Sequence, residues 1–260
     1  MPRLSNKIIL DYQNKGWVKI KNFIKKNEVK ILEKKISSII LNDIKKNKKK
    51  SRHINFATSN NDQNIDQLNS FHKLDSSNWI KKFAKRKNFI SIVKSILGSK
   101  PELRASEFFA KPARVGLPAP IHQDNYYWAV AGSNALTIWV ALNDSNRKNG
   151  GVFYYEGSHK YGILDHKPSF AKGSSQTIKN KFFLKKFKKV FPSLKKGDAI
   201  IHHTLVVHGS ENNNSKKSRK GWTMQYKDKL AEYDYDQIKK YEKSLNYQIK
   251  LRGKNRHAGT

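Results

Sequence analysis

The chain has 260 residues, no cysteine, and 53 lysines and arginines against 20 aspartates and glutamates, which gives a formal net charge of +33. The lack of cysteine excludes disulfides and thiolate metal sites, so a bound metal would need histidine and carboxylate ligands. No apolar run reaches the roughly 18 residues of a membrane span, and no secretory leader is visible at the N-terminus, so we expect a cytoplasmic protein.

The positive charge has two interpretations. One is a polyanionic partner such as nucleic acid or an anionic membrane surface. The other is a coding bias, because the chain is also rich in asparagine and isoleucine, which an AT-rich genome enriches together with lysine. Lysines are scattered along the whole chain and outnumber the arginines that base and phosphate recognition prefer. The sequence favours the coding bias and stays compatible with an anionic small substrate.

The first hundred residues have a mainly helical pattern. A helix is expected before a short strand in "GWVKIKNF", and apolar residues at helical spacing predict a lysine-rich helix that begins near Asn27. Residues 47–70 are polar without periodicity, which predicts a surface loop. Residues 77–98 are expected to be helical and to end at Gly98, shortly before Pro101.

Beyond residue 100 the pattern changes to short β-branched and aromatic runs separated by glycine, proline and asparagine. Several such runs without helices between them predict an antiparallel sandwich or barrel. Residues 179–193 form an insertion of undetermined structure, and a helix is expected from about Glu232. The predicted fold class is mainly β with flanking helices. We predict a single domain over 1–260, made of a mainly helical part (1–100), a β core (101–230) and a helical, basic tail (231–260).

Two of the apolar runs contain polar residues that suit a metal. In "IHQDNYYW" (121–128), interpreted as one strand, His122 and Asp124 share a face because side chains alternate along a strand. In "GDAIIHHTLVVHGS", also interpreted as one strand, His208 needs a partner because burying an unpaired imidazole is unfavourable. Each feature alone fits a surface pair or a hydrogen-bonded core histidine. Together, two histidines and one carboxylate on neighbouring strands form the facial triad typical of non-haem Fe(II).

Arg219 is the third element of the predicted site. It follows His208 by eleven residues, at the start of the predicted strand "RKGWTMQY". A guanidinium group at the mouth of a barrel can bind a dicarboxylate with two parallel hydrogen bonds. Without this spacing, a solvated basic residue within "KKSRK" would be the simpler interpretation.

The combination of "HQD", "GGVFYYEGSHK", "GDAIIHHTLVVHGS" and the arginine that follows resembles the phytanoyl-CoA dioxygenase (PhyH) family of Fe(II)- and 2-oxoglutarate-dependent oxygenases. The resemblance covers most of the chain and implies a double-stranded β-helix core, that is, a cupin-like jelly-roll. It implies that His122, Asp124 and His208 are iron ligands. It also implies that Arg219 binds the distal carboxylate of 2-oxoglutarate.

Two further cosubstrate contacts follow from the same resemblance, namely Ser210 and Trp139. The implied reaction consumes 2-oxoglutarate and O2, releases succinate and CO2, and hydroxylates an unactivated C–H bond of a small organic substrate. This class of small organic substrates includes anionic and CoA-linked compounds. The intact carboxylate of Asp124 favours hydroxylation over halogenation, because halogenating relatives carry a small residue at that position.

The substrate itself is not determined by the sequence, and neither is the oligomeric state. The candidate substrate contacts are the aromatic residues Tyr126, Trp128, Phe108, Tyr154 and Tyr155, with Lys111 and Arg104 for an anionic group. Core packing is the simpler interpretation of each aromatic residue. Three remaining histidines, His159, His202 and His203, are expected to have supporting or packing roles. The alternative function is a basic jelly-roll module that binds nucleic acid or another polyanion without turnover.

Overall fold

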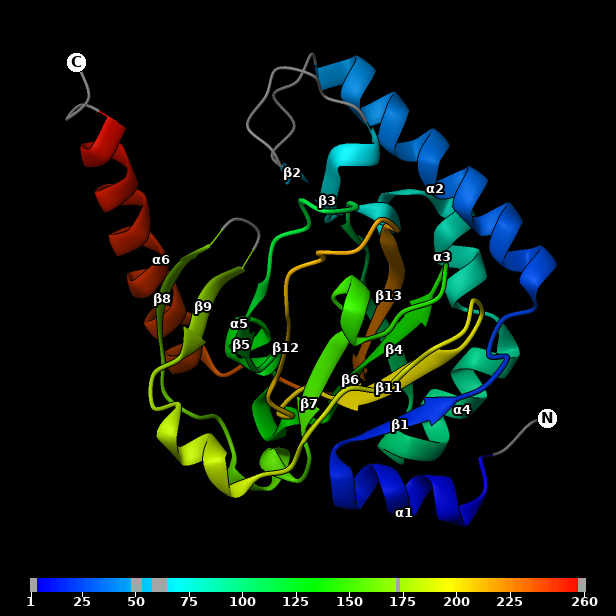
Figure 1. The fold of residues 1–260 in the computed structure, drawn as a ribbon. Helices are drawn as coiled ribbons and strands as arrows, with labels where there is room; N and C mark the ends of the chain where they lie inside the picture. Colours follow the sequence, from blue (N-terminus) through cyan, green and yellow to red (C-terminus); the bar gives the residue numbers. More distant parts are fainter. Residues whose placement is uncertain (1–3, 48–52, 58–64, 172–173, 257–260) are drawn as a thin grey trace.

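The computed structural model describes residues 4–47, 53–57, 65–171 and 174–256 (Figure 1). The α-helices are α1 (Asn6–Lys15), α2 (Lys26–Asn47), α3 (Asn78–Ala84), α4 (Lys87–Leu97), α5 (Asn125–Trp128) and α6 (Tyr235–Arg256). Short 3-10 helices connect several strands: η1 (Ile65–Gln67), η2 (Leu74–Ser76), η3 (Ala131–Ser133), η4 (Arg147–Asn149), η5 (Ser158–Tyr161) and η6 (Phe182–Lys186). No helix of the described ranges combines the length and the apolar character needed to cross a bilayer.

Two antiparallel sheets form the centre of the molecule. The seven-stranded sheet has the order β1 (Trp17–Ile20), β11 (Ala199–His203), β6 (Ala135–Ala141), β13 (Arg219–Asp228), β4 (Pro101–Lys111), β3 (Leu68–Phe71) and β2 (Ile54–Phe56). The four-stranded sheet has the order β10 (Lys189–Val190), β7 (Val152–Tyr155), β12 (His208–Ser210) and β5 (Ala119–His122). A hairpin of β8 (His166–Ala171) and β9 (Ser174–Ile178) lies beside α6 (Figure 1).

The large sheet is covered on both faces, and β6 shows this most clearly because every one of its residues is buried. Leu136, Ile138 and Val140 pack into a core shared with α2, α3 and α4. Trp139 points the other way and packs with Tyr154 of β7 in the small sheet. Side chains alternate along a strand, so this face lies between the two sheets. We call it the inner face. The predicted jelly-roll arrangement is confirmed.

The helix side of the large sheet is covered by α2 (Figure 1). Its buried residues are Val29, Leu32, Ile36 and Ile40, spaced by three and four positions as one face of a helix requires. Gly98 ends α4 in the left-handed conformation, with φ +71°, and its N–H donates to the carbonyl of Lys94. This ending agrees with the prediction, because glycine has no Cβ to clash in that conformation.

The N-terminal part contains more strand than its sequence pattern indicates. The predicted loop over 47–70 contains β2, the edge strand of the large sheet, and the start of β3, where Leu68 is fully buried. Residues 48–52 and 58–64 of this range lie outside the described residues. The predicted helix over 77–98 is two helices, because Arg86 adopts an extended backbone between α3 and α4. The insertion over 179–193 forms η6 and β10.

Two predicted strands are interrupted at the candidate metal ligands, which corrects the sequence interpretation. The strand expected over 121–128 ends at His122, and Asp124 already has helical dihedral angles (φ −59°, ψ −40°) at the start of α5. The strand expected through His208 is two strands in different sheets, since β11 ends at His203 and β12 begins at His208. The short apolar run between them carries the chain from one sheet to the other. Periodicity alone cannot show such a crossing.

The packing of α2 predicts a large effect at Leu32, which is fully buried. We expect Leu32→Ala to lower the free energy of unfolding by about 2–5 kcal/mol, because it leaves a cavity in the shared core. Leu41 lies on the same helix with 44% of its surface exposed, so Leu41→Ala should cost less than about 1 kcal/mol. Denaturant titration of both variants measures the difference. Equal losses would contradict the described orientation of α2.

Candidate metal centre

His122, Asp124 and His208 come together between the sheets. His122 on β5 and His208 on β12 are directly paired across the small sheet, and their ring centroids lie 4.4 Å apart. Oδ1 of Asp124 lies 3.6 Å from Nε2 of each histidine. One ligand atom from each of the three residues lies within 4.8 Å of the others, as a shared metal ion requires. The turn into α5, and not strand alternation, brings Asp124 to His122.

Both histidines are oriented by the backbone. Nδ1 of His122 lies 2.7 Å from the carbonyl oxygen of Pro120, and Nδ1 of His208 lies 3.0 Å from that of Val206. A carbonyl oxygen only accepts, so Nδ1 carries the proton and Nε2 keeps its lone pair for a metal. Burial lowers the pKa of His208 to about 3, which keeps its imidazole neutral. Two imidazole nitrogens and one carboxylate fit Fe(II) with open positions for other ligands.

The two oxygens of Asp124 have different partners. Oδ2 accepts a hydrogen bond of 2.7 Å from Oγ1 of Thr137 and lies 3.1 Å from Nε2 of His202. His202 is in turn held by the hydroxyl of Tyr154, 3.1 Å from its Nδ1. Burial by itself raises the pKa of Asp124, but hydrogen bonds to the carboxylate favour its charged form, and its pKa lies well below the usual value. Oδ2 is thus occupied by protein donors, while Oδ1 faces the two ligand histidines.

The three remaining candidate histidines separate into two environments. His202 lies at the metal centre, whereas His159 and His203 lie near each other, with ring centroids 5.3 Å apart. Nε2 of His159 lies 3.0 Å from the carbonyl oxygen of Gln13, which places it beside the end of α1. Thr137 was not singled out by the sequence. The available signal was a hydroxyl within the otherwise apolar run "ALTIWVA".

The bond from Thr137 to Asp124 predicts an effect on metal affinity. We expect Thr137→Val to weaken binding of a divalent metal by about 10- to 100-fold, because one of the two donors that orient the carboxylate is lost. Thr137→Ser keeps the hydroxyl and should retain most of the affinity. Calorimetric titration with Mn(II), which is stable in air, compares the two variants. Equal metal affinity of the valine and serine variants would contradict the role of the Thr137 hydroxyl in orienting Asp124.

Two buried basic side chains lie side by side at one end of the inner face. Arg219 of β13 pairs in register with Lys111 of β4, and each residue is 3% exposed. The Arg219 guanidinium donates to the carbonyl of Gly150, at 3.3 Å from Nε and 3.1 Å from Nη2. Lys111 Nζ donates to the carbonyl of Leu117. Among the residues that the structure describes, neither Arg219 nor Lys111 forms an ion pair. This end of the inner face is therefore suited to an anion.

Trp139 and Ser210 lie near the same end. The Arg219 guanidinium carbon is 5.3 Å from the centre of the Trp139 ring. The indole covers Gly221, where a Cβ would come within 2.1 Å of Trp139 Cζ2, so this strand position needs a residue without a side chain. Ser210 pairs with Val152, two residues beyond the Gly150 carbonyl that binds Arg219. The structure therefore places Arg219 beside Trp139, and Ser210 on the small-sheet strand that pairs with the residues following Gly150.

The protonation state of Lys111 gives a test of how strongly this end of the inner face is buried. Burial, and then the nearby charge of Arg219, lower the pKa of Lys111 from 10.5 to about 6. Between these two pH values the unfolded chain binds a proton that the folded protein does not, so this group makes stability rise with pH through the window. We expect Lys111→Met to remove the rise. The free energy of unfolding of Lys111→Met should exceed that of wild type most near pH 6, and the difference should shrink toward pH 9.

The comparison uses denaturant titrations of wild type and Lys111→Met at several pH values between 6 and 9. Lys217 is exposed on the loop before β13, and Lys217→Met serves as the matched control. A pH-independent difference between Lys111→Met and wild type would show that Lys111 is not held neutral in the folded protein.

The aromatic residues after Asp124 are arranged by a helix and not by a strand. Tyr126 stacks on His166 with ring centroids 4.0 Å apart, and Trp128 is buried beneath the guanidinium of Arg104, 4.8 Å from its ring. Tyr127, which the expected alternation directed away from the site, has its ring 5.6 Å from that of His122. The helical turn of α5 changes which of these side chains faces the metal ligands.

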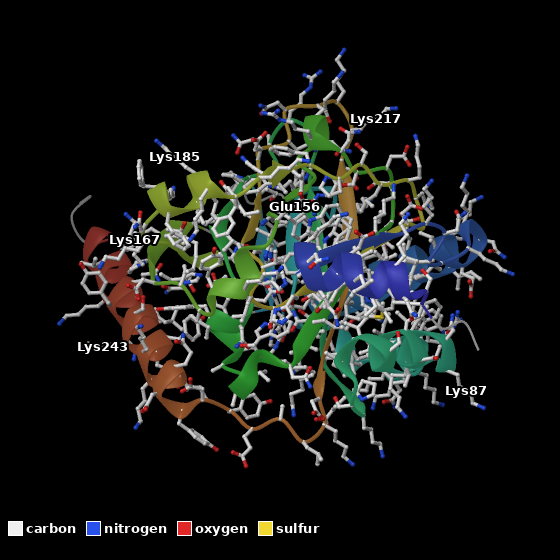
Figure 2. The ribbon with its side chains drawn as sticks, turned by 90° about the horizontal axis from the view of Figure 1, so that it is seen from below. Lys87, Glu156, Lys167, Lys185, Lys217 and Lys243 are labelled. Atoms are coloured by element: carbon white, nitrogen blue, oxygen red, sulfur yellow. The ribbon has the colours of Figure 1, made fainter. Side chains whose placement is uncertain are left out.

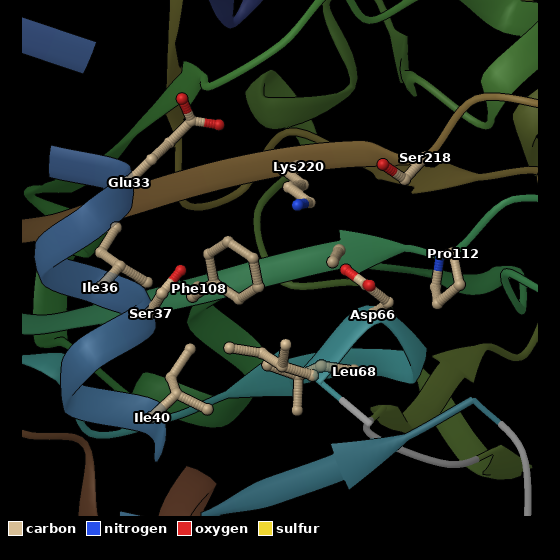
Figure 3. A pocket seen from close by; sticks show the side chains of 12 residues that line it. Glu33, Ile36, Ser37, Ile40, Asp66, Leu68, Phe108, Pro112, Ser218 and Lys220 are labelled. Carbon is tan, nitrogen blue, oxygen red and sulfur yellow. The ribbon is translucent and has the colours of Figure 1, made fainter. Parts of the chain in front are cut away.

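Phe108 is not brought to the metal ligands. It lies on the helix side of β4 and lines a cavity of about 100 Å³ between α2, η1 and β4, where it faces Ile36 and Ile40 (Figure 3). Neighbouring Glu107 points to the inner face, because side chains alternate along the strand. The sequence did not show which face of this strand meets the metal.

A jelly-roll with a two-histidine, one-carboxylate cluster between its sheets defines a facial-triad metalloprotein. The family model of phytanoyl-CoA dioxygenase (PhyH) matches residues 12–221, and the chain belongs to this family. Within this family, the chain is 28% identical over 157 residues to a phytanoyl-CoA dioxygenase of Arabidopsis thaliana. The aligned residues cover 60% of this chain and 54% of the relative. The chain spans about half of that relative's length.

Other relatives cover more of the chain. A probable alpha-ketoglutarate-dependent hypophosphite dioxygenase of Stutzerimonas stutzeri is 23% identical over 79% of this chain and 72% of its own. Among solved structures, EctD from S. alaskensis with 2-oxoglutarate and 5-hydroxyectoine superposes with a TM-score of 0.72 at 17% identity, covering 89% of this chain and 78% of its own. The carbocyclase SnoK from nogalamycin biosynthesis gives 0.70 at 20% identity, covering 88% and 86%. These likenesses show the shared fold.

Proposed function

We propose that the protein is an Fe(II)- and 2-oxoglutarate-dependent oxygenase that hydroxylates a C–H bond of a small organic substrate. The observation that carries the proposal is the fully buried guanidinium of Arg219, which has no carboxylate partner among the described residues although it lies on the same inner face as the metal ligands. Burying a charge without a partner is costly, so an anionic ligand is expected there. A short dicarboxylate could contact both Arg219 and the metal.

The roles of the individual residues follow from their positions. His122, Asp124 and His208 would hold Fe(II), with Thr137 and His202 keeping Oδ1 of Asp124 turned toward it. The bound metal supplies the activation of O2, and the overall reaction converts R–H, 2-oxoglutarate and O2 into R–OH, succinate and CO2. The chain contributes orientation and exclusion of water.

At the other end of the cosubstrate, Arg219 would bind the distal carboxylate with its remaining guanidinium donors. Ser210 would add a hydroxyl donor to the same group. Trp139 would pack against the methylene groups between the two ends of 2-oxoglutarate. Burial lowers the pKa of Arg219 to about 10, which leaves the guanidinium charged at neutral pH.

The names of the relatives support this function. The Stutzerimonas stutzeri protein is named as an alpha-ketoglutarate-dependent dioxygenase, and EctD was solved with 2-oxoglutarate and with bound Fe. Family membership gives no support to the alternative of a nucleic-acid-binding module. Labelled lysines on α4, β8, η6, α6 and the loop before β13 point outward on different sides of the molecule, which agrees with a coding bias (Figure 2). A cytoplasmic location stays a prediction.

Arg219 provides the decisive test. We expect Fe(II) and 2-oxoglutarate together to raise Tm and to support slow succinate formation without added substrate. Arg219→Met should weaken 2-oxoglutarate binding by about 10- to 100-fold, the equivalent of one hydrogen-bonded charged group, while metal affinity is retained. Calorimetry on the Mn(II)-loaded protein measures both affinities.

Arg147 is a suitable control, because its side chain is 66% exposed beside the same turn. Arg147→Met should bind 2-oxoglutarate like wild type. Unchanged affinity in Arg219→Met, or succinate formation that does not depend on Fe(II), would contradict the proposed function.

A further inference from the structure

A chain of hydrogen-bonded polar side chains crosses the inner face of the large sheet beside the metal centre. Arg104 Nη1 donates to Gln225 Oε1 at 2.7 Å, and Gln225 Nε2 donates to Glu107 Oε2 at 2.6 Å. The other Glu107 oxygen lies 2.8 Å from Nδ1 of His72, whose Nε2 lies 2.8 Å from Ser70 Oγ. We call Arg104, Gln225, Glu107 and His72 the polar subsite. The proposed cosubstrate contacts do not use these residues.

The strand register places the polar subsite next to the metal ligands. Gln225 of β13 is paired with Thr137 of β6, and Thr137 is the residue that binds Asp124. Neighbouring strands lie about 4.8 Å apart, so Gln225 is one strand and β4 two strands, about 10 Å, from the support of the metal ligand. Burial lowers the pKa of Arg104, and the nearby carboxylates of Glu107 and Asp124 partly offset this effect. The guanidinium also lies over Trp128, four residues after Asp124.

The polar subsite has unused binding capacity. A guanidinium has five N–H donors, and in the described part of the chain the Arg104 side chain donates one hydrogen bond, to Gln225. A carboxylate accepts about four hydrogen bonds, and Glu107 has two side-chain partners, one on each oxygen. The Glu107 side chain is 16% exposed and that of His72 is 26% exposed, so both can be reached by solvent.

The two charges of the polar subsite are opposite and held apart. Arg104 and Glu107 do not form an ion pair with each other; the amide of Gln225 lies between them, with its oxygen toward Arg104 and its nitrogen toward Glu107. A ligand with an anionic end and a cationic end can pair with both groups. An acyl chain in the same place would remove water from both charges without replacing it, which is costly.

We propose that the polar subsite binds the primary substrate and that this substrate is a small zwitterion of the amino-acid type. Its anionic group binds Arg104 and its ammonium group binds Glu107, which holds a carbon of the substrate toward the metal ligands. His72 and Gln225 are positioning residues for Glu107. This inference rests on the proposed oxygenase function and specifies the substrate class for the same site.

The test measures succinate formation by the Fe(II)-loaded protein with 2-oxoglutarate and one added compound at a time. The panel contains free α-amino acids, their methyl esters, their N-acetyl derivatives, octanoate and octanoyl-CoA. We expect stimulation above the substrate-free rate by at least one free amino acid. The ester that lacks the anion and the N-acetyl compound that lacks the cation should each lose at least tenfold of that stimulation.

Variants assign the two ends of the ligand. Arg104→Met should abolish the preference for the free acid over its ester, and Glu107→Gln the preference for the free amine over its N-acetyl derivative. Arg86 also lies over an aromatic ring, 3.7 Å from the centre of Phe83, but on the helix side, so Arg86→Met is the control for the loss of a stacked guanidinium. Glu102 lies on the same strand and pairs with Lys227, so Glu102→Gln is the control for the carboxylate. Both controls should keep the wild-type preferences.

Binding of the stimulating amino acid to the Mn(II)- and 2-oxoglutarate-loaded protein, measured by calorimetry, gives a readout independent of turnover. Arg104→Lys retains the charge without the fork and should bind more tightly than Arg104→Met. If the polar subsite were only structural, substitutions in it would lower Tm without changing which end of the ligand is recognised. Stimulation by octanoyl-CoA but by no amino acid, or no stimulation by any panel member while substrate-free turnover is normal, would overturn the inference. Absence of substrate-free turnover would instead count against the proposed function.

Discussion

The carboxylate of Asp124 links the two sheets, and the site depends on how its two oxygens are divided. Asp124 follows β5 of the small sheet, yet Oδ2 is bound by Thr137 and His202 of the large sheet. Oδ1 is left facing His122 and His208. Buried carboxylate oxygens need partners, so this division positions the ligand atom and fixes the distance between the sheets at the same time.

Around this link, charge is distributed unevenly over the inner face. One end has the buried guanidinium of Arg219 beside Lys111, with no acidic partner for either among the described residues, and the Thr137–Gln225 side has Arg104 and Glu107 with opposite charges. The buried guanidinium of Arg219 is costly without a ligand, since a desolvated charge gains stability only when it is paired, whereas Arg104 and Glu107 keep unused hydrogen-bonding capacity. The first suits a dicarboxylate cosubstrate and the second a zwitterionic substrate, with the metal ligands on the same face. The lysines labelled in Figure 2, by contrast, point outward and take no part in this arrangement.

Much of the site was predictable because its parts are local in sequence. The H-x-D pair, the histidine before Gly-Ser and the arginine eleven residues later carry their chemistry in their residue types and spacing. The supporting residues were harder to find. Thr137 and Gln225 are ordinary strand residues, and their importance comes from a pairing between β6 and β13 that spans 88 positions of the chain. Phe108 and Glu107 show the same limit, since their residue types do not indicate which face of β4 each side chain occupies.

By itself, the sequence determined the mainly β class, the helix that ends at Gly98, the absence of thiolate ligands, and the two histidines and one carboxylate that could hold a metal. These follow from composition, local backbone preference and side-chain chemistry. Only the tertiary structure decided that "IHQDNYYW" leaves its strand after His122, that His202 and His208 lie in different sheets, and that Tyr127 faces the ligand His122. Each of these depends on where the chain crosses between the sheets, and that crossing is set by long-range packing that no local pattern records.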